Sequence, residues 1–259
     1  MHKKFSKSTS WQSSGKWYHQ IVGKKGHYYH QTVVIPKTLK LLALKASQKD
    51  SLLDLAAGQG VLSRHLPKGI FYSGVDAAKD LILSASQYDR SSDHHFICAD
   101  VTKKLPLEKK DFSHASIILA LQNIETPAKV MENASFHLKE KGKLLIVVNH
   151  PCFRIPRQTS WQIDANSQTR FRRIDRYLSP LTIPIQTHPS QGKDSPQTWS
   201  FHHPLSSYFH WLKEAGFTIL NLEEWCSDKK SEGKSSAAKM ENRSRQEIPL
   251  FMAILAEKI

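Results

Sequence analysis

A small-residue turn and a following acidic side chain are the features of this sequence whose types and spacing suggest chemistry. The stretch 51–60 begins with a mostly apolar run and ends in a turn that contains Gly58 and Gly60. Small side chains let a ligand lie against backbone N–H groups. Asp76 ends the next apolar run, and an acid about twenty positions after such a turn is placed to bind ribose hydroxyls. The pattern predicts a nucleoside-cofactor site.

Strand and helix patterns that alternate along the chain would hold these residues in place. Apolar runs of strand length alternate with segments of helical spacing, and a long helix-poor stretch interrupts the rhythm after residue 149. This order predicts an α/β protein with a doubly wound, mostly parallel sheet of seven strands. The expected strands are 51–56, 71–75, 95–100, 112–121, 143–149, 217–225 and 248–256. One expected helix begins at Pro36, and four more span 61–66, 78–86, 127–138 and 204–215.

Composition shifts divide the chain into four parts. Residues 1–14 are rich in Ser and Lys and are expected to be a disordered basic leader. Residues 15–149 form a cofactor-binding core with an aromatic cap at its start. Residues 150–203 contain six prolines, and a loop of that length is typical of a lid or substrate-binding insertion. Residues 204–259 return to the core, within which the polar stretch 227–246 is expected to be a mobile surface loop.

The net charge of +14 is unevenly distributed. Residues 1–49 hold ten Lys and no acid, and the insertion is also basic, which leaves the rest of the chain near neutral. The leader and the insertion could therefore contact nucleic acid or another acidic surface, and a solvated tail is the alternative. The three cysteines are far apart, and together with the absence of a signal peptide or a membrane-spanning apolar run they predict a cytoplasmic protein with reduced thiols.

Two common nucleotide-binding patterns are absent. No stretch matches the phosphate-binding loop G-x-x-x-x-G-K-[ST]. The dinucleotide fingerprint needs a third glycine after Gly58 and Gly60, and Ser63 occupies that position. A nucleoside cofactor without a pyrophosphate remains, and S-adenosylmethionine is the common one.

The chain resembles the class I S-adenosylmethionine-dependent methyltransferases, most closely their UbiE/UbiG-like branch (methyltransferase types 11, 12 and 25). The family turn acid-x-Gly-x-Gly-x-Gly stands here as Asp54-Leu55-Ala56-Ala57-Gly58-Gln59-Gly60, with alanine at the first glycine position. The family acids after strands two and three match Asp76 and Asp100. The segment after strand four, often hydrophobic-Glu-His-hydrophobic, stands as Leu121-Gln122-Asn123-Ile124. The resemblance covers residues 17–259.

The resemblance implies roles for these positions. Gly58 and its neighbours would lie against the methionine part of S-adenosylmethionine, Asp76 would accept hydrogen bonds from the ribose, and Asp100 with Val101 would contact the adenine. For each acid a helix N-cap or a solvated loop position is the alternative. The implied cofactor-binding residues are Tyr28, Asp54, Ala56, Ala57, Gly58, Gln59, Gly60, Asp76, Ala77, Asp100, Val101, Leu119 and Leu121.

Methyl transfer from a sulfonium mainly requires alignment of nucleophile and methyl group, with a base where the nucleophile needs one. His150 directly follows the fifth expected strand and is the candidate base, with a hydrogen-bonded turn histidine as the alternative. His27 could cover the cofactor together with Tyr28.

Arg154, Arg157 and Tyr177 of the insertion are candidate substrate contacts, because a guanidinium binds carboxylate or phosphate. The adjacent histidine pairs His94-His95 and His202-His203 lack metal-ligand spacing, so no metal site is expected.

The favoured function is methyl transfer from S-adenosylmethionine to a small-molecule acceptor. Two alternatives stay open: an RNA or other nucleic-acid methyltransferase guided by the basic leader, and a binding or regulatory module that keeps the fold without catalysis. The sequence leaves the acceptor atom and the oligomeric state undetermined.

Overall fold

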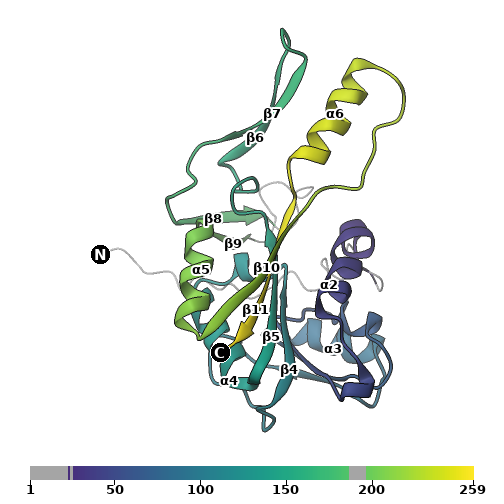
Figure 1. Ribbon diagram of the computed structural model, residues 1–259, viewed down its shortest axis with the longest axis vertical. Helices are drawn as coiled ribbons and strands as arrows, with labels where there is room; N and C mark the ends of the chain where they lie inside the picture. Colours follow the sequence, from purple (N-terminus) through teal and green to yellow (C-terminus); the bar gives the residue numbers. More distant parts are fainter. Residues whose placement is uncertain (1–22, 24–25, 187–196) are drawn as a thin grey trace.

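A seven-stranded sheet forms the centre of the molecule in the computed structural model, which describes residues 23, 26–186 and 197–259 (Figure 1). The strand order is β3-β2-β1-β4-β5-β11-β10. Strands β1 to β5 run parallel to one another, and β11 is antiparallel to both β5 and β10. The doubly wound, mostly parallel sheet predicted from the sequence is confirmed. The strands are β1 (Ser51–Leu55), β2 (Phe71–Asp76), β3 (His94–Cys98), β4 (Phe112–Ile118), β5 (Leu138–Asn149), β10 (Phe217–Trp225) and β11 (Phe251–Lys258).

Helices cover both faces of the sheet. Figure 1 shows α2 and α3 on one side of it and α4 and α5 on the other. Side chains that alternate along β5 therefore enter two separate cores: Leu144 and Ile146 pack with α4 and α5, whereas Leu145 and Val147 pack with α2. Burial on both faces explains why the central strands are continuous apolar runs. The helices are α2 (Ile35–Leu42), α3 (Lys79–Tyr88), α4 (Pro127–His137), α5 (Leu205–Glu214) and α6 (Ser236–Glu247).

The chain order reverses between β1 and β4. The chain leaves β1 toward β2 on one side and reaches β4 on the other side after β3. In open α/β sheets the ligand crevice lies outside the carboxyl ends of the strands at such a point. The fold therefore brings the turn after β1 and the loops after β2, β3 and β4 to one end of the sheet.

Three local expectations were wrong. Residues 61–66 do not form an α-helix; after the turn only the short 3-10 helix Ser63–His65 forms, and Pro67 follows it closely. Residues 150–203 are not a plain loop, because they contain the hairpins β6 (Thr159–Asp164) with β7 (Thr169–Ile174) and β8 (Leu181–Gln186) with β9 (Gln197–His202). The polar stretch 227–246 contains all but the last residue of α6, and the Ser235 side chain caps this helix by accepting from the Ala238 N–H.

Hairpin β6–β7 and helix α6 project together from the end of the sheet (Figure 1). An ion pair joins them, with Arg170 Nη1 3.0 Å from Glu241 Oε1. The expected basic leader, residues 1–14, lies outside the described residues. None of the helices in the described part of the chain is long and apolar enough to cross a membrane.

Candidate active site

A cavity of about 910 Å³ lies at the carboxyl ends of the parallel strands. Its walls come from the turn after β1 and from the loops that follow β2, β3, β4 and β5. The segment before α2 and the start of β11 complete it, with Ile185 of β8 and Arg154 contributed by the 150–203 insertion. The sequence-predicted turn and both family acids therefore meet in one cavity of a size typical for small-ligand sites.

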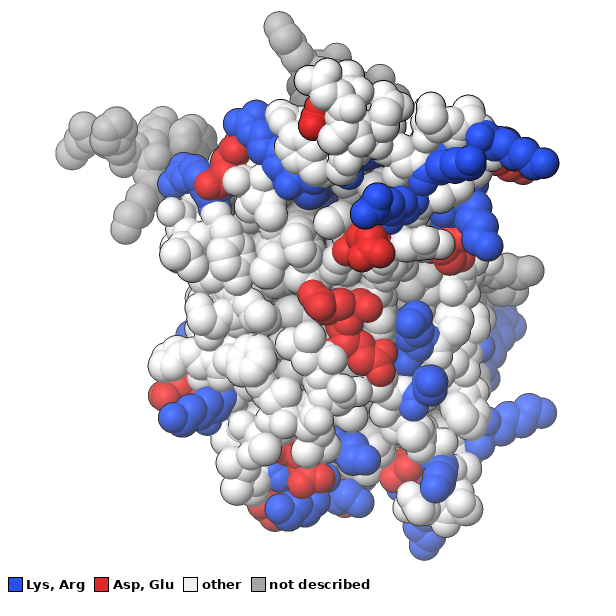
Figure 2. Space-filling model, turned by 45° about the horizontal axis from the view of Figure 1, so that its top comes forward, with Lys and Arg blue, Asp and Glu red and all other residues white. Residues whose placement is uncertain are grey.

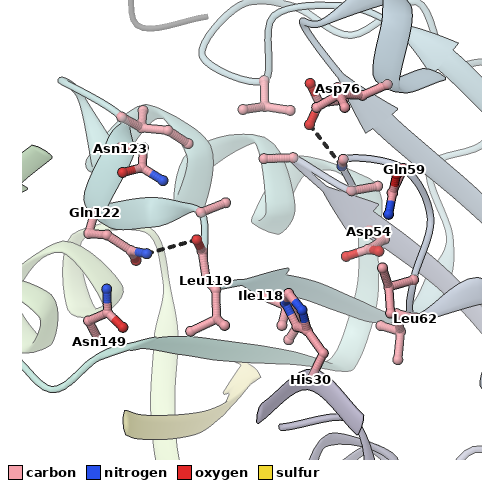
Figure 3. A pocket seen from close by; sticks show the side chains of 18 of the residues that line it. His30, Asp54, Gln59, Leu62, Asp76, Ile118, Leu119, Gln122, Asn123 and Asn149 are labelled. Atoms are coloured by element: carbon pink, nitrogen blue, oxygen red, sulfur yellow. Dashed lines mark hydrogen bonds between the residues drawn. The ribbon is translucent and has the colours of Figure 1, made fainter. Parts of the chain in front are cut away.

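Asp76 connects the loop after β2 to the turn after β1. Its Oδ2 accepts a hydrogen bond from the Gly58 N–H at 2.9 Å (Figure 3). Its Oδ1 accepts one from the Ala78 N–H at 2.8 Å. Burial raises the pKa of the Asp76 carboxyl, and these two N–H groups oppose that rise. Each oxygen keeps a further lone pair, so the carboxylate is fixed in place while it can still accept from a ligand.

Asp54 lies deeper, at the end of β1, and is 3% exposed. Tyr72 donates to its Oδ2 at 2.8 Å, and Ser116 donates to its Oδ1 at 2.7 Å. Burial raises the pKa of the Asp54 carboxyl to about 6, against the two hydroxyl hydrogen bonds, which lower it. The side chain lines the cavity floor, and with this pKa it is mostly ionised at pH 7.

Asp100 lies in the loop after β3 and lines the cavity together with Val101. Its Oδ1 accepts from the Thr102 N–H at 2.9 Å and from the Thr102 hydroxyl at 2.7 Å. Burial raises the pKa of this carboxyl, but the Thr102 hydrogen bonds and Lys103 outweigh burial, so the pKa lies below its ordinary value. Asp100 is therefore a carboxylate at neutral pH.

Two non-glycine residues of the cavity wall adopt left-handed backbone conformations. Ala56 has φ +59° and Leu119 has φ +53°. The left-handed region costs an L-residue roughly 1–2 kcal/mol relative to glycine. Ala56 stands where the family motif has its first glycine, so the structure explains in physical terms why glycine is favoured there. Gly60 also has positive φ, and a Cβ there would lie 2.8 Å from the Phe96 ring.

The segment before α2 contributes aromatic side chains. His27, Tyr29 and His30 line the cavity, and the two imidazole rings lie 4.0 Å apart between centroids. Burial, with His27 nearby, lowers the pKa of His30 to about 3, so its ring is neutral at pH 7. Its Nδ1 is buried and has no hydrogen-bond partner among the described residues. Figure 3 shows His30 across the cavity floor from Asp54, beside Ile118.

Amide side chains gather on the side of the cavity opposite Asp76. Figure 3 shows Gln122, Asn123 and Asn149 there, from the loop after β4 and the end of β5. The Gln122 amide donates to the Leu119 carbonyl at 2.7 Å, while its Oε1 is buried without a partner in the described part of the chain. This wall offers both donors and acceptors to a polar ligand.

Many of the sequence-predicted site residues line the cavity. The turn and the two family acids come together as expected, and Arg154 reaches the same space from the insertion. The predicted residues that line the cavity are His27, Asp54, Ala56, Ala57, Gly58, Gln59, Asp76, Ala77, Asp100, Val101, Leu119 and Arg154.

Five other predicted contacts lie elsewhere. Tyr28 is 43% exposed and donates to Asp228 Oδ2 at 3.1 Å. Leu121 is buried in the core beside α4, and Gly60 packs against Phe96 behind the turn. Arg157 is exposed on the surface of the insertion, and the Tyr177 hydroxyl accepts from the Leu205 N–H at the start of α5.

His150 is also outside the cavity lining and is 2% exposed. Its Nδ1 accepts from the Cys152 N–H at 3.2 Å, so the neutral ring carries its proton on Nε2 and donates it to Glu224 Oε1 at 2.6 Å. Burial and Arg154 lower the pKa of His150, against Glu224, which raises it. Both ring nitrogens are engaged, so the geometry favours the alternative of a hydrogen-bonded turn histidine, and a general-base role for His150 stays a prediction.

Sequence reasoning missed several residues of the cavity wall. Tyr29 and His30 directly follow the predicted Tyr28. In such a run of aromatic residues, the sequence does not show which side chains face the cavity and which are exposed. Asn149 directly precedes the predicted His150, and alternation along β5 could have identified it as the side chain on the other face. The unpredicted lining residues also include Leu62, Ile118, Gln122, Asn123, Leu250 and Phe251.

No group of three or more His, Cys, Asp or Glu side chains with the arrangement of a metal site occurs in the ranges that the structure describes.

Comparisons with known proteins agree with this geometry. Residues 53–146 match the family model of a methyltransferase domain. A demethylmenaquinone methyltransferase of Paenarthrobacter aurescens (strain TC1) is 27% identical over 180 residues, which cover 68% of this chain and 64% of that protein, so the match spans less than two thirds of the relative's length.

Two solved structures share the fold. An S-adenosylmethionine-dependent methyltransferase from Mesorhizobium loti aligns with a TM-score of 0.65 and 24% identity, covering 85% of this chain and 96% of that one. The glycopeptide N-methyltransferase MtfA in complex with S-adenosylmethionine aligns with a TM-score of 0.56 and 13% identity, covering 87% of each chain. The match of residues 53–146 to a methyltransferase domain and the shared strand order show that this chain is similar in fold to S-adenosylmethionine-dependent methyltransferases.

Proposed function

We propose that this protein transfers a methyl group from S-adenosylmethionine to a small-molecule acceptor. The observation that carries the proposal is the position of Asp76, whose two oxygens are each fixed by one backbone N–H at the rim of a cavity beside the turn after β1. A carboxylate fixed in this way can accept from the two ribose hydroxyls of a nucleoside.

The residues around the cavity fit the rest of the cofactor. Ala57 and Gly58 offer a turn with little side-chain bulk for the methionine part, and Asp54 on the floor offers a negative charge for its ammonium group. Asp100 and Val101 offer a carboxylate and an apolar surface for the adenine. The unpartnered Nδ1 of His30 and Oε1 of Gln122 are polar atoms that a ligand would satisfy.

S-adenosylmethionine supplies a methyl group that is already activated by the sulfonium. The protein then needs to hold the acceptor in line with that group and to exclude water. The amides of Gln122, Asn123 and Asn149 can orient a polar acceptor from the side opposite Asp76. Ile185 and Arg154 of the 150–203 insertion line the same cavity, as residues of a lid or substrate-binding segment would.

A small acceptor suits a cavity of about 910 Å³, which lies within the range of small-ligand sites. Two of the related proteins are named for small or peptidic acceptors, demethylmenaquinone and a glycopeptide.

Two measurements test the proposal. Calorimetry with S-adenosylhomocysteine should show one binding event for the folded protein, and no heat would reject the cofactor assignment. Transfer from S-adenosylmethionine with an isotope-labelled methyl group should label a component of a small-metabolite extract. Label that enters only RNA would overturn the acceptor class, and binding without any transfer would favour the non-catalytic module.

A further inference from the structure

A second, smaller cavity of about 190 Å³ adjoins the active-site cavity and shares Tyr29, Arg154 and Leu250 with it. We call it the arginine pocket. Three guanidinium groups and one carboxylate line it, so it is positive at neutral pH. Hairpin β6–β7 and α6 form the projecting end of the molecule (Figure 1). Figure 2 shows basic side chains around this end, with fewer acidic ones between them. Its other lining residues are Trp161, Arg170, Ser227, Glu241 and Arg245.

The carboxylate of this pocket is already occupied by cations. Glu241 Oε1 lies 3.0 Å from Arg170 Nη1 and 2.8 Å from Arg245 Nη2, and its Oε2 accepts from the Ser231 hydroxyl. Glu241 therefore pairs with one arginine from hairpin β6–β7 and one from α6, and it joins these two elements.

Arg154 has no such carboxylate. No acid lies within ion-pair distance of it in the described ranges, where its guanidinium makes one long hydrogen bond, from Nε to the Pro249 carbonyl at 3.4 Å. It lies 5.7 Å from the centroid of the Trp161 ring, which Arg170 and Arg172 also approach, at 4.5 and 5.3 Å. Three guanidinium groups are thus held around one indole ring.

The positive charge of the Arg154 guanidinium therefore has no carboxylate partner among the described residues. Burial and repulsion from Arg172 lower the pKa of Arg154 to about 10, so the group remains charged at pH 7 in an unfavourable environment. Lys229 adds another positive charge nearby, 5.2 Å from the Tyr29 ring centroid. The hydroxyls of Tyr29 and Ser227, 3.0 Å apart, are further potential donors at the pocket.

We propose that the arginine pocket binds an anionic group of the methyl acceptor, a carboxylate or a phosphate, and that Arg154 is the residue that contacts this group. The proposal rests on the function proposed above, because it assigns the acceptor class of the same site. Arg154 lines both cavities, so a ligand whose anionic group lies at its guanidinium can extend its nucleophile into the active-site cavity. A planar guanidinium with free N–H groups binds either anion through paired hydrogen bonds.

The test uses the full chain saturated with S-adenosylhomocysteine and three small probes: benzoate, phenyl phosphate and the neutral benzamide. Binding of each is measured by ligand-observed NMR titration. We expect at least one anion to bind the protein about tenfold or more tightly than benzamide does, because charge-assisted hydrogen bonds are roughly twice as strong as neutral ones. The preferred anion identifies carboxylate or phosphate as the group.

The substitution Arg154→Gln should weaken binding of the preferred anion by about tenfold or more, and Arg154→Lys should weaken it less, because the charge remains but the paired geometry is lost. Lys239→Gln removes one exposed positive charge from α6 and should leave anion binding within about twofold of the original. Retained affinity for S-adenosylhomocysteine in Arg154→Gln shows that this variant is folded.

Anion binding that Arg154→Gln leaves unchanged, or benzamide binding equal to that of both anions, would overturn the proposal. Displacement of the anion by a short RNA oligonucleotide at lower concentration would also overturn it, in favour of a nucleic-acid phosphate. The same titrations without S-adenosylhomocysteine separate the two proposals. Loss of cofactor binding with intact anion binding rejects the proposed function alone, and the reverse result rejects the acceptor class alone.

Discussion

The Asp76 carboxylate accepts a hydrogen bond from the Gly58 N–H at 2.9 Å, and this contact joins the loop after β2 to the turn after β1. The second oxygen of Asp76 accepts from the Ala78 N–H at the start of α3. One side chain therefore fixes the relative position of the two loops that are expected to hold opposite parts of the cofactor. These two contacts limit which residue can replace Asp76, because any substitute must accept two N–H hydrogen bonds at once.

Replacement of Asp76 by asparagine should weaken S-adenosylhomocysteine binding by roughly 10-fold or more. The amide has one oxygen, so its NH₂ group must face either a backbone N–H or the ligand, and the loss of hydrogen bonds to a charged group costs about 1.5–3 kcal/mol. Calorimetry measures the affinity. Asp93→Asn, at an exposed position before β3, is the matched control and should stay within about twofold. Unchanged affinity in a folded Asp76→Asn protein would contradict the assignment of the ribose site.

The stability difference between the Asp54→Asn variant and the original protein should depend on pH. Burial raises the pKa of folded Asp54 from 3.8 to about 6. The folded state therefore binds this proton more tightly than the unfolded state, and the stabilisation is present below pH 3.8 and lost as the pH rises to about 6. Asparagine has no such proton. Relative to the original protein, Asp54→Asn should gain about 2 kcal/mol of unfolding free energy between pH 4 and pH 7.

Urea denaturation of both proteins across this pH range checks that expectation. The variant changes the hydrogen bonds to Tyr72 and Ser116 by an amount that does not vary with pH, so only the slope is informative. Titration of the other carboxylates cancels in the difference between the two proteins. A constant difference from pH 4 to pH 7 would show that Asp54 titrates as an ordinary exposed acid.

The central strands were predictable because their burial leaves a direct mark on the sequence. β5 contributes Leu144 to Val148 to two cores at once, which requires a continuous apolar run. The acids at the strand ends were predictable for a related reason, since a polar residue that closes such a run lies at the ligand edge of a parallel sheet. The switch in strand order then determines which of these ends meet.

Elements that bury little were missed. Helix α6 buries only Ala238 and Ser244 among its own residues, so the polar sequence of the segment resembles a loop. The strands of hairpin β6–β7 contain no fully buried residue, and pairing between neighbouring strands stabilises them without an apolar pattern. The α-helix expected over residues 61–66 does not form, for another reason. Pro67 ends the segment soon after Val61, which leaves room only for a single short turn.

Replacement of Ala56 by glycine should preserve the stability of the fold, whereas replacement of Ala57 by glycine should lower it. Ala56 has φ +59°, whereas Ala57 is not among the residues with positive φ. Relief of the left-handed strain offsets the greater flexibility of unfolded glycine in Ala56→Gly. We expect the unfolding free energy of Ala56→Gly to stay level or rise by up to about 1 kcal/mol, and that of Ala57→Gly to fall by about 0.5–1 kcal/mol.

Chemical denaturation of the two variants side by side makes this comparison, and each variant serves as the control of the other. Both remove one methyl group from the same turn, so the differing backbone conformation accounts for the difference between them. Equal losses in the two proteins would show that the conformation of Ala56 carries no strain.

His150→Ala should destabilise the fold and leave cofactor binding intact. The ring is buried and joins the turn after β5 to β10, through the Cys152 N–H on Nδ1 and Glu224 on Nε2. Its removal leaves a cavity and an unpartnered backbone N–H, for which we expect a loss of about 2–4 kcal/mol in the free energy of unfolding. Affinity for S-adenosylhomocysteine should change by no more than about twofold, because none of its atoms lines the cavity.

Glu224→Gln is the matched control, because its amide oxygen can still accept from His150 Nε2–H, and it should cost less than about 1.5 kcal/mol. A general base would behave differently from an anchoring histidine. If His150→Ala kept its stability but lost methyl transfer, and if the acid limb of the pH–rate profile disappeared with it, the ring would have to leave Glu224 and enter the cavity during turnover. The anchoring role derived from its two hydrogen bonds would then be wrong.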